Sequence, residues 1–299
     1  EYIYPETSEE QIAISNIEKK LLSKSNDMSS LDAFSIAVLS SYRPLNKYTI
    51  LGEKPHEKVL HLVYKEQIDN FHEEKLIATK INKLTKIKDN ISLTIKSQYE
   101  ENPYPRWNKC GQLFPYESVY DFKNSLLLKE KKHELKNINK LDILIAGCGT
   151  GKQAITTATR FPDSKILAID LSNSSLAFAI RKAKELKIDN IEFMSGDIIE
   201  LRNFKKKFDI IECCGVLHHL KNPTEGLKIL NNLLKKKGLM YLSLYSEHAR
   251  SSINVAKKVI NKANLTNNKQ DILKFRNYVI NIDDELLNPL AYRQEHNKT

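Results

Sequence analysis

The sequence predicts an α/β fold, a doubly wound and mostly parallel sheet preceded by an α-helical N-terminal region. From Leu141 onward, short apolar runs alternate with stretches of helical periodicity, and a glycine-rich loop separates the first run from the first helix. Before about residue 95, apolar residues recur at helical spacing only. Strands and helices that alternate in this way form parallel sheets with helices on both faces.

Five strands and four helices are expected in the second half of the chain. The strands are predicted at 142–146, 165–169, 191–194, 208–212 and 239–244, and the helices at 152–160, 173–186, 224–234 and 247–263. Sheets of this kind bind ligands beyond the carboxyl ends of their strands, near the point where the strand order reverses.

The N-terminal region is expected to consist of helices and to be an interaction or dimerisation module. A first helix is predicted over residues 8–22, a second over residues 31–41, and a third after Pro55. No glycine motif, metal-ligand cluster or repeat occurs there. A binding module is therefore favoured over a catalytic one.

Four parts are expected along the chain. They are a helical region at 1–95, an aromatic and proline-rich lid and linker at 96–137, a ligand-binding core at 138–263, and a C-terminal tail at 264–299 that leads to domains absent here. Both ends look abrupt, since the chain begins with Glu1. We therefore expect a fragment of a longer protein, a trimmed chain or the product of a split gene.

Composition is that of an ordinary globular protein, with 41% hydrophobic and 28% charged residues. No apolar run approaches the ~20 residues that a transmembrane helix needs, and no signal-peptide pattern is present. Membrane insertion is not expected, and the cytoplasm is the expected location. The four cysteines form no CxxC pair, so neither a disulfide framework nor a metal site is expected.

The formal net charge of +10 permits a nucleic acid or an acidic partner. Lysine is abundant throughout, however, and the runs at 205–207 and 235–237 are expected to lie in loops. A solvated surface is the favoured interpretation, and nucleic-acid binding is not expected.

The glycine-rich loop Gly147-Cys148-Gly149-Thr150-Gly151 follows the first predicted strand directly and opens a helix. Glycines there permit a tight turn and let a ligand approach the backbone. The spacing differs from the GxGxxG of dinucleotide binders, and no phosphate-binding lysine-serine pair follows. Alone, the loop indicates only a nucleotide-like ligand.

Two acidic residues follow the next two strands. Asp170 lies 170 − 147 = 23 residues after Gly147, where a carboxylate can accept hydrogen bonds from both ribose hydroxyls. Helix capping is the alternative, although Ser172 can serve that purpose. Asp197 suits the amino group of an adenine ring, with Ile198 against the ring face; capping is again the alternative.

Two further segments are expected to border the ligand. The fourth strand continues into residues 212–220, which should line the reacting face. Upstream, residues 98–107 combine aromatic, acidic and proline residues. Two X-Pro steps favour extended backbone, so we expect an ordered loop and not a helix; a rigid linker is the alternative.

Together these motifs resemble class I S-adenosylmethionine-dependent methyltransferases. The matching runs are ILIAGCGTGKQA, KILAIDLSNSSLAFAIRKAKEL, IEFMSGDI, FDIIECCGVLHHLKNP and GLMYLSLYSEHAR. With QYEENPYPRW upstream, the chain resembles the bacterial set that includes the rickettsial protein-lysine methyltransferases acting on outer membrane protein B. That set is longer at both ends, and the antiparallel sixth and seventh strands of the usual sheet are not evident here.

The resemblance implies a Rossmann-like fold, S-adenosylmethionine as cofactor and S-adenosylhomocysteine as product. The residues expected to bind the cofactor are Tyr104, Arg106, Gly147, Cys148, Gly149, Gly151, Asp170, Leu171, Gly196, Asp197, Ile198, Cys213 and Gly215. Those expected at the catalytic face are Tyr99, Glu100, Trp107, Glu212 and His218. For His218, a packing role is the favoured alternative to general-base catalysis.

The expected function is methyl transfer to lysine side chains of a protein with accessible lysines, such as a rickettsial outer membrane protein, by a chain that forms a homodimer. A methyltransferase for a small molecule or RNA is one alternative. A non-catalytic cofactor-binding or dimerisation fragment is another. The motifs up to Asp197 serve the cofactor alone, so they do not separate these possibilities.

Overall fold

The computed structural model describes residues 6–23, 32–48, 58–111, 115, 140–282, 287 and 290. The chain forms two compact units, which are described separately. The helical unit comprises Glu1–Phe71 and Tyr245–Thr299, and the sheet unit comprises His72–Leu244. The expected linker beyond Gly111 and the expected tail beyond Ile282 lie almost wholly outside the described residues.

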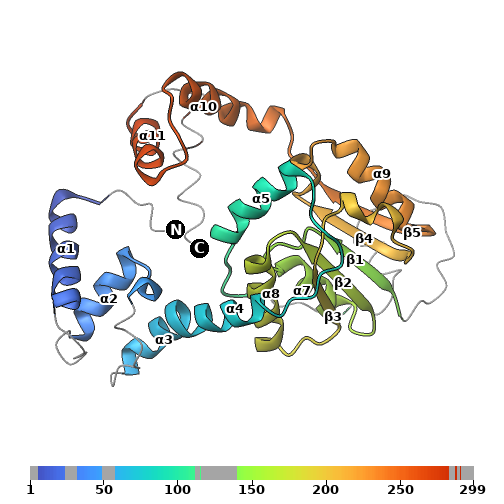
Figure 1. The fold of residues 1–299 in the computed structure, drawn as a ribbon, viewed down its shortest axis with the longest axis horizontal. Helices are drawn as coiled ribbons and strands as arrows, with labels where there is room; N and C mark the ends of the chain where they lie inside the picture. The colour runs from blue at the N-terminus through green and yellow to red at the C-terminus, as the bar shows by residue number, and fades with distance from the viewer. Residues whose placement is uncertain are drawn as a thin grey trace. The chain divides into compact units, whose positions relative to one another are not determined.

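The sheet unit is built on five parallel strands in the order β3-β2-β1-β4-β5 (Figure 1). These are β1 (Asp142–Ala146), β2 (Lys165–Asp170), β3 (Ile191–Ser195), β4 (Phe208–Cys214) and β5 (Leu234–Ser243). The strand order reverses between β1 and β4, which is the switch point of a doubly wound sheet. The predicted fold class is confirmed, and within the described residues the sheet ends at β5.

The start of β5 corrects one prediction. The lysines at 235–237 were expected in a loop, but they lie in β5, which begins at Leu234 opposite Phe208. A register shift follows between Phe208 and Ile210. The three lysines lie within this irregular stretch, between the Leu234–Phe208 pair and the Leu239–Ile210 pair. Their side chains remain exposed, and Lys235 pairs with Asp209 at 2.8 Å, so the strand includes this polar segment without burying its charges.

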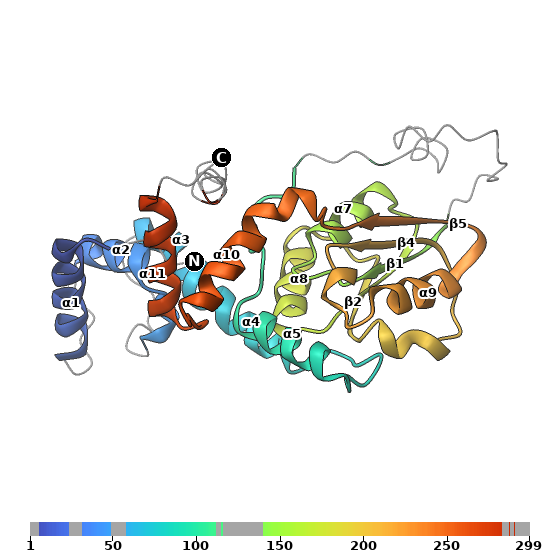
Figure 2. The same cartoon turned by 90° about the horizontal axis from the view of Figure 1, so that it is seen from above.

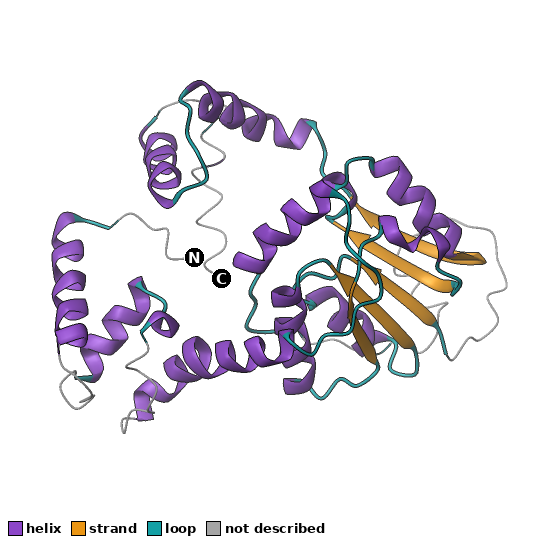
Figure 3. Ribbon diagram, viewed as in Figure 1, coloured by secondary structure: helices purple, strands orange, loops and turns teal. Residues whose placement is uncertain are grey.

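Helices cover both faces of the sheet (Figures 2 and 3). On one face, Ile143 and Ile145 of β1 pack with α7 (Lys152–Arg160) and α8 (Asn173–Glu185). On the other, Leu144 and Ala146 pack with α9 (Pro223–Leu233) and the 3-10 helix η6 (Ile199–Asn203). Because both faces of β1 are buried after Asp142, residues 143–146 are all apolar and do not alternate with polar residues.

Helix α5 (Asn90–Glu101) corrects a second prediction. Residues 98–107 were expected to form a loop, but 98–101 are the last turn of α5. Asp89 caps the helix start by accepting from the Ser92 backbone N–H at 3.0 Å. Each proline restricts only the residue before it. The helix therefore continues to Glu101 and ends at Asn102, which precedes Pro103 and has non-helical dihedral angles.

The helical unit confirms the predicted N-terminal helices. They are α1 (Ser8–Ser23), α2 (Ala33–Tyr42), the 3-10 turns η2 (Leu45–Lys47) and η4 (Lys58–Leu60), α3 (His61–Tyr64), the π-turn η5 (Lys65–Asp69) and α4 (Asn70–Ala78), which continues into the sheet unit. The C-terminal elements are η8 (His248–Arg250), α10 (Ser251–Lys262) and α11 (Lys269–Asn281). Leu39, Leu45 and Tyr64 lie in the core of this unit. Among the helices described, none has the length and apolarity to cross a bilayer.

Replacement of Gly151 by alanine tests how tightly the glycine loop packs. Gly151 has a φ of +80°, and a Cβ there would lie 2.4 Å from the Cβ of Ala179 in α8. Backbone strain and overpacking cost about 1–3 kcal/mol each, so Gly151→Ala should destabilise the sheet unit by about 3 kcal/mol. Urea unfolding followed by the fluorescence of Trp107, the single tryptophan of the chain, measures this.

Gly215→Ala is the matched control, since Gly215 also has a positive φ of +71° but no atom lies within 4 Å of an added Cβ. Backbone strain alone should then cost about 1 kcal/mol. Equal destabilisation by the two substitutions would contradict close packing at Gly151.

Candidate functional site

The glycine-rich loop of residues 147–151 connects β1 to α7 at the switch point of the sheet. Gly147, Gly149 and Gly151 all have positive φ angles, of 79°, 52° and 80°. A Cβ on Gly147 would lie 2.3 Å from a methyl carbon of Val216. The Gly147 and Cys148 backbone N–H groups both donate to the carbonyl of Ile169 at 2.9 Å. The loop is thus a tight cradle with little room for side chains.

Asp170 ends β2 and joins the glycine loop to α8. Its Oδ2 accepts the Gly149 N–H at 2.8 Å, and its Oδ1 accepts the Ser172 N–H at 2.9 Å. Ser172 itself caps α8 by accepting from Ser175 at 3.0 Å, so Asp170 is not the helix cap. Burial raises the pKa of Asp170 despite these donors. Each carboxylate oxygen has two lone pairs, which leaves acceptor capacity for ligand hydroxyls.

Asp197 follows β3 and is only 1% exposed. Its Oδ1 accepts the Ile199 N–H at 3.0 Å, which is the local capping contact. No group in the described part of the chain donates a well-aligned hydrogen bond to Oδ2. Burial raises the pKa of this carboxyl, although the nearby Ser92 hydroxyl lowers it in part. A buried acceptor without a donor suits a ligand N–H.

Glu212 lies in β4 and is buried against α7. Gln153 donates to its Oε2 at 2.6 Å, and the Thr157 hydroxyl donates to its two oxygens at 3.1 and 3.0 Å. Burial raises the pKa of Glu212. The next residue, Cys213, is fully buried in the opposite core, and burial raises the pKa of its thiol to about 12. In this arrangement, Glu212 ties β4 to the first turns of α7.

Glu100, in the last turn of α5, binds the start of α8. Its Oε1 accepts the Asn173 N–H at 2.9 Å and its Oε2 accepts the Ser174 N–H at 2.8 Å. Burial alone would raise the pKa of Glu100, but the donors from Ser174 and Asn173, together with Lys96, lower it. A carboxylate at a helix N-terminus satisfies free N–H groups and opposes the helix dipole.

Aromatic side chains from α5 and from the segment after β4 meet at this edge of the sheet. The ring of Tyr99 lies edge-on to His219 with centroids 6.4 Å apart, and the His218 and His219 rings are 4.3 Å apart. Tyr104 is 69% exposed, while its carbonyl oxygen lies 3.8 Å from the position of a Cβ on Gly149. Tyr99, His218 and Tyr104 therefore come from three segments that border the carboxyl edge.

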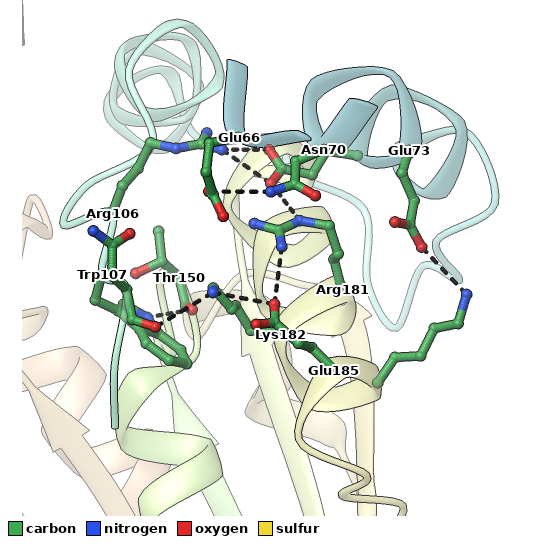
Figure 4. A network of polar contacts seen from close by, with 12 residues as sticks. Glu66, Asn70, Glu73, Arg106, Trp107, Thr150, Arg181, Lys182 and Glu185 are labelled. Carbon is green, nitrogen blue, oxygen red and sulfur yellow. Dashed lines mark hydrogen bonds and ion pairs between the residues drawn. The ribbon is translucent and has the colours of Figure 1, made fainter. Parts of the chain in front are cut away.

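Arg106 and Trp107 are directed toward α8 (Figure 4). The Trp107 indole N–H donates to the Thr150 carbonyl at 3.1 Å, and its ring packs edge-on to Phe178 at 5.8 Å. Arg106 pairs with Glu74 at 2.8 Å. These contacts hold residues 104–107 against α8 and the glycine loop. The contacts that were predicted for Arg106 with the cofactor and for Trp107 at the catalytic face stay predictions.

Two groups stand out among the predicted site residues. The glycine loop, Asp170 and Asp197, followed by Leu171, Gly196 and Ile198, lie together at the carboxyl ends of β1, β2 and β3. Glu100 accepts hydrogen bonds from the start of α8, and Glu212 accepts hydrogen bonds from α7. Sequence reasoning missed Glu74 and Thr150, whose Oγ donates to the Pro105 carbonyl at 2.5 Å. Neither contact has a local sequence signal.

Comparison with known proteins identifies the class. The model of a family described as a methyltransferase domain matches residues 135–284, half of the chain. The chain therefore belongs to the class I S-adenosylmethionine-dependent methyltransferases, and S-adenosylmethionine is its cofactor. The glycine cradle, the acceptor capacity of Asp170 and the free Oδ2 of Asp197 fit this cofactor.

Individual relatives differ in the reactions for which they are named. A ubiquinone biosynthesis O-methyltransferase of Rickettsia bellii is 27% identical over 49% of this chain and 59% of that relative. A malonyl-acyl-carrier protein O-methyltransferase of Halalkalibacterium halodurans is 34% identical over 40% of this chain and 44% of that relative. PKMT2 of Rickettsia typhi in complex with AdoHcy is 25% identical, with a TM-score of 0.40, over 50% of this chain and 30% of that chain. The chain spans about half the length of the curated relatives it matches, 41% for a Synechococcus protein.

Asp170→Asn tests the ribose assignment. The amide nitrogen accepts no hydrogen bond, so one of the two backbone contacts and the negative charge are lost. Hydrogen bonds to a charged group contribute about 1.5–3 kcal/mol, so affinity for S-adenosylmethionine should fall at least ~10-fold in titration calorimetry. Asp163→Asn, in an exposed turn after α7, is the control and should bind normally. Unchanged affinity in Asp170→Asn would contradict the assignment.

The contact between Glu100 and α8 predicts a pH dependence. Because the pKa of Glu100 is lower in the folded chain than its ordinary value of 4.5, the contact stabilises fully above that value and is lost as the pH falls through the folded-state pKa. Glu100→Gln should therefore lower the urea midpoint at pH 7, and the difference from the parent should shrink below about pH 4. A difference that does not vary between pH 7 and pH 3 would refute the charged contact.

Proposed function

We propose that the chain transfers methyl groups from S-adenosylmethionine to lysine side chains of a protein substrate. The observation that carries the proposal is that the two carboxylates predicted at the catalytic face, Glu100 and Glu212, already accept hydrogen bonds from the protein. A reaction that needs no carboxylate as a strong base fits this arrangement. The resemblance of residues 98–107 to the protein-lysine methyltransferases supports the same acceptor.

The chain's own residues would hold the cofactor at its ribose, its adenine ring and its amino-acid portion. Asp170 would accept from the ribose hydroxyls, and Asp197 Oδ2 from the adenine amino group. Gly147 and Gly149 would let the amino-acid portion approach the backbone. The cofactor supplies an electrophilic methyl group on a sulfonium centre. Positioning of donor and acceptor can contribute roughly 7–11 kcal/mol to lowering the barrier.

A lysine acceptor must lose a proton before it attacks. At its reference pKa of ~10.4, only about one molecule in a few thousand is neutral at pH 7, which costs about 4–5 kcal/mol. Burial beside another cation lowers a lysine pKa by up to ~3–5 units. Tyr99 and Tyr104 could hold the side chain meanwhile, since aromatic faces attract ammonium groups.

A second candidate is methyl transfer to a hydroxyl group of a small molecule. The adjacent rings of His218 and His219, 4.3 Å apart, could supply the general base that a hydroxyl acceptor needs. Two relatives named above carry O-methyltransferase names. A methyltransferase for RNA and a cofactor-binding module without catalysis are the remaining possibilities.

Transfer of a labelled methyl group distinguishes these candidates. The full chain is incubated with methyl-labelled S-adenosylmethionine and, in separate reactions, with a lysine-rich bacterial outer membrane protein, total RNA and small phenols. We expect label on lysine side chains, located by mass spectrometry. His218→Ala should leave most of this activity, because no base is required. Label on hydroxyl groups that depends on His218 would favour the second candidate and contradict the first.

The partner and compartment are proposed on separate grounds. The four cysteines are all free, which supports a reducing compartment such as the cytoplasm. Exposed apolar side chains in the helical unit, among them Phe34 and Leu62, support the proposed homodimer. The molar mass of the purified chain, measured by light scattering, checks the dimer, which would have twice the 34.5 kDa mass of the chain.

A further inference from the structure

Glu74 of α4 is a buried carboxylate that binds two guanidinium groups. Arg106 donates to both of its oxygens, at 2.9 and 2.8 Å, and Arg181 of α8 donates to Oε1 at 2.8 Å. We infer that Glu74 is a positioning residue for cofactor binding. Through Arg106 it holds the clamp loop, residues 104–107, against the glycine loop, without touching the cofactor itself.

The two guanidinium groups pack around one aromatic ring of α8. The Cζ atoms of Arg106 and Arg181 lie 4.7 and 5.1 Å from the centre of the Phe178 ring. Such placement over an aromatic ring is attractive, but two cations near one ring repel each other unless an anion lies between them. The Glu74 carboxylate is that anion.

The clamp loop continues this contact to the glycine loop. Trp107 follows Arg106 directly and donates to the Thr150 carbonyl at 3.1 Å. In return, the Thr150 hydroxyl donates to the Pro105 carbonyl at 2.5 Å. Thr150 lies between Gly149, whose N–H binds Asp170, and Gly151. The contacts therefore run from Glu74 to the backbone that cradles the cofactor.

The two arginines depend on Glu74 to different degrees. Arg181 is 5% exposed and also pairs with Glu185 at 3.2 Å, so it keeps a carboxylate if Glu74 is neutralised. Arg106 is 31% exposed, and Glu74 is the one carboxylate with which it pairs in the described part of the chain. Loss of the Glu74 charge should therefore release Arg106 toward water, and the clamp loop with it.

Neighbouring Glu73 offers a matched control. It also pairs with a cation of α8, Lys184, at 3.2 Å, but the two side chains are 41% and 77% exposed. Exposed ion pairs contribute little, whereas removal of one partner from a buried pair leaves an uncompensated charge. Glu73→Gln and Glu74→Gln thus differ in burial while sharing the helix, the substitution and the partner helix.

The test follows the clamp loop and the cofactor in the same variants. Trp107 is the single tryptophan of the chain, so its emission reports the clamp loop directly. In Glu74→Gln, we expect the emission to shift to longer wavelength and the dissociation constant for S-adenosylmethionine, measured by calorimetry, to rise at least fivefold. Glu74→Asp should restore part of both, and Glu73→Gln should change neither.

Other outcomes would overturn the inference. A purely structural role would lower the melting temperature of Glu74→Gln and leave Trp107 emission and affinity unchanged. Weaker cofactor binding without a change in emission would show that Glu74 acts by another route. If Glu74→Gln fails to fold, Arg106→Met removes the other partner of the same ion pair, and this partner is the more exposed of the two. Arg106→Met must then reproduce both the shift in Trp107 emission and the weaker cofactor binding.

The inference rests on the cofactor of the proposed function and not on its acceptor. Failure of Glu74→Gln to alter binding would leave lysine methylation untouched. Failure of lysine methylation would leave the Trp107 and affinity measurements unaffected. If the parent chain bound no S-adenosylmethionine, the cofactor assignment would fail before Glu74 is considered.

Discussion

The arrangement at the carboxyl edge of the sheet depends on one carboxylate, that of Asp170. It accepts the Gly149 N–H with one oxygen and the Ser172 N–H with the other, so the end of β2 holds both the glycine loop and the entry to α8. The loop backbone has positive φ angles that only glycine adopts readily. The carboxylate fixes the Gly149 N–H, and the Ile169 carbonyl accepts the N–H groups of Gly147 and Cys148. The carboxylate oxygens of Asp170 retain acceptor capacity for a ligand.

Residues before β1 complete this arrangement in the sheet unit. Glu100 of α5 binds the first N–H groups of α8. Thr85 accepts the Asp197 N–H at 2.9 Å, and residues 82–84 pair with Ser195 at the end of β3. Residues 72–107 therefore belong to the same compact unit as the sheet, because their polar groups find their partners there.

Buried polar contacts in the sheet unit serve two different purposes. Glu212, Gln153 and Thr157 satisfy one another between β4 and α7, and burial raises the pKa of the carboxyl. Asp197 retains an oxygen without a well-aligned donor in the described residues. A buried acceptor left without a donor costs free energy, so this oxygen is available to a ligand donor. The first group stabilises the fold, and Asp197 Oδ2 is the acceptor that the proposed cofactor contact would use.

Local patterns in the sequence were enough to predict the strands, the helices between them, the glycine loop and the acids after β2 and β3. These features depend on residue periodicity and on short motifs, which act over a few positions. The start of β5 and the last turn of α5 were mispredicted, because the pairing of Leu234 with Phe208 and the continuation of α5 to Glu101 have no signal in the local composition.

Tertiary structure alone decided the partners of the charged groups. Glu100 meets α8 across 73 residues, Glu212 meets Gln153 across 59, and Glu74 meets Arg181 across 107. Pairings over such distances follow from packing of the folded chain, and no local pattern in the sequence encodes them.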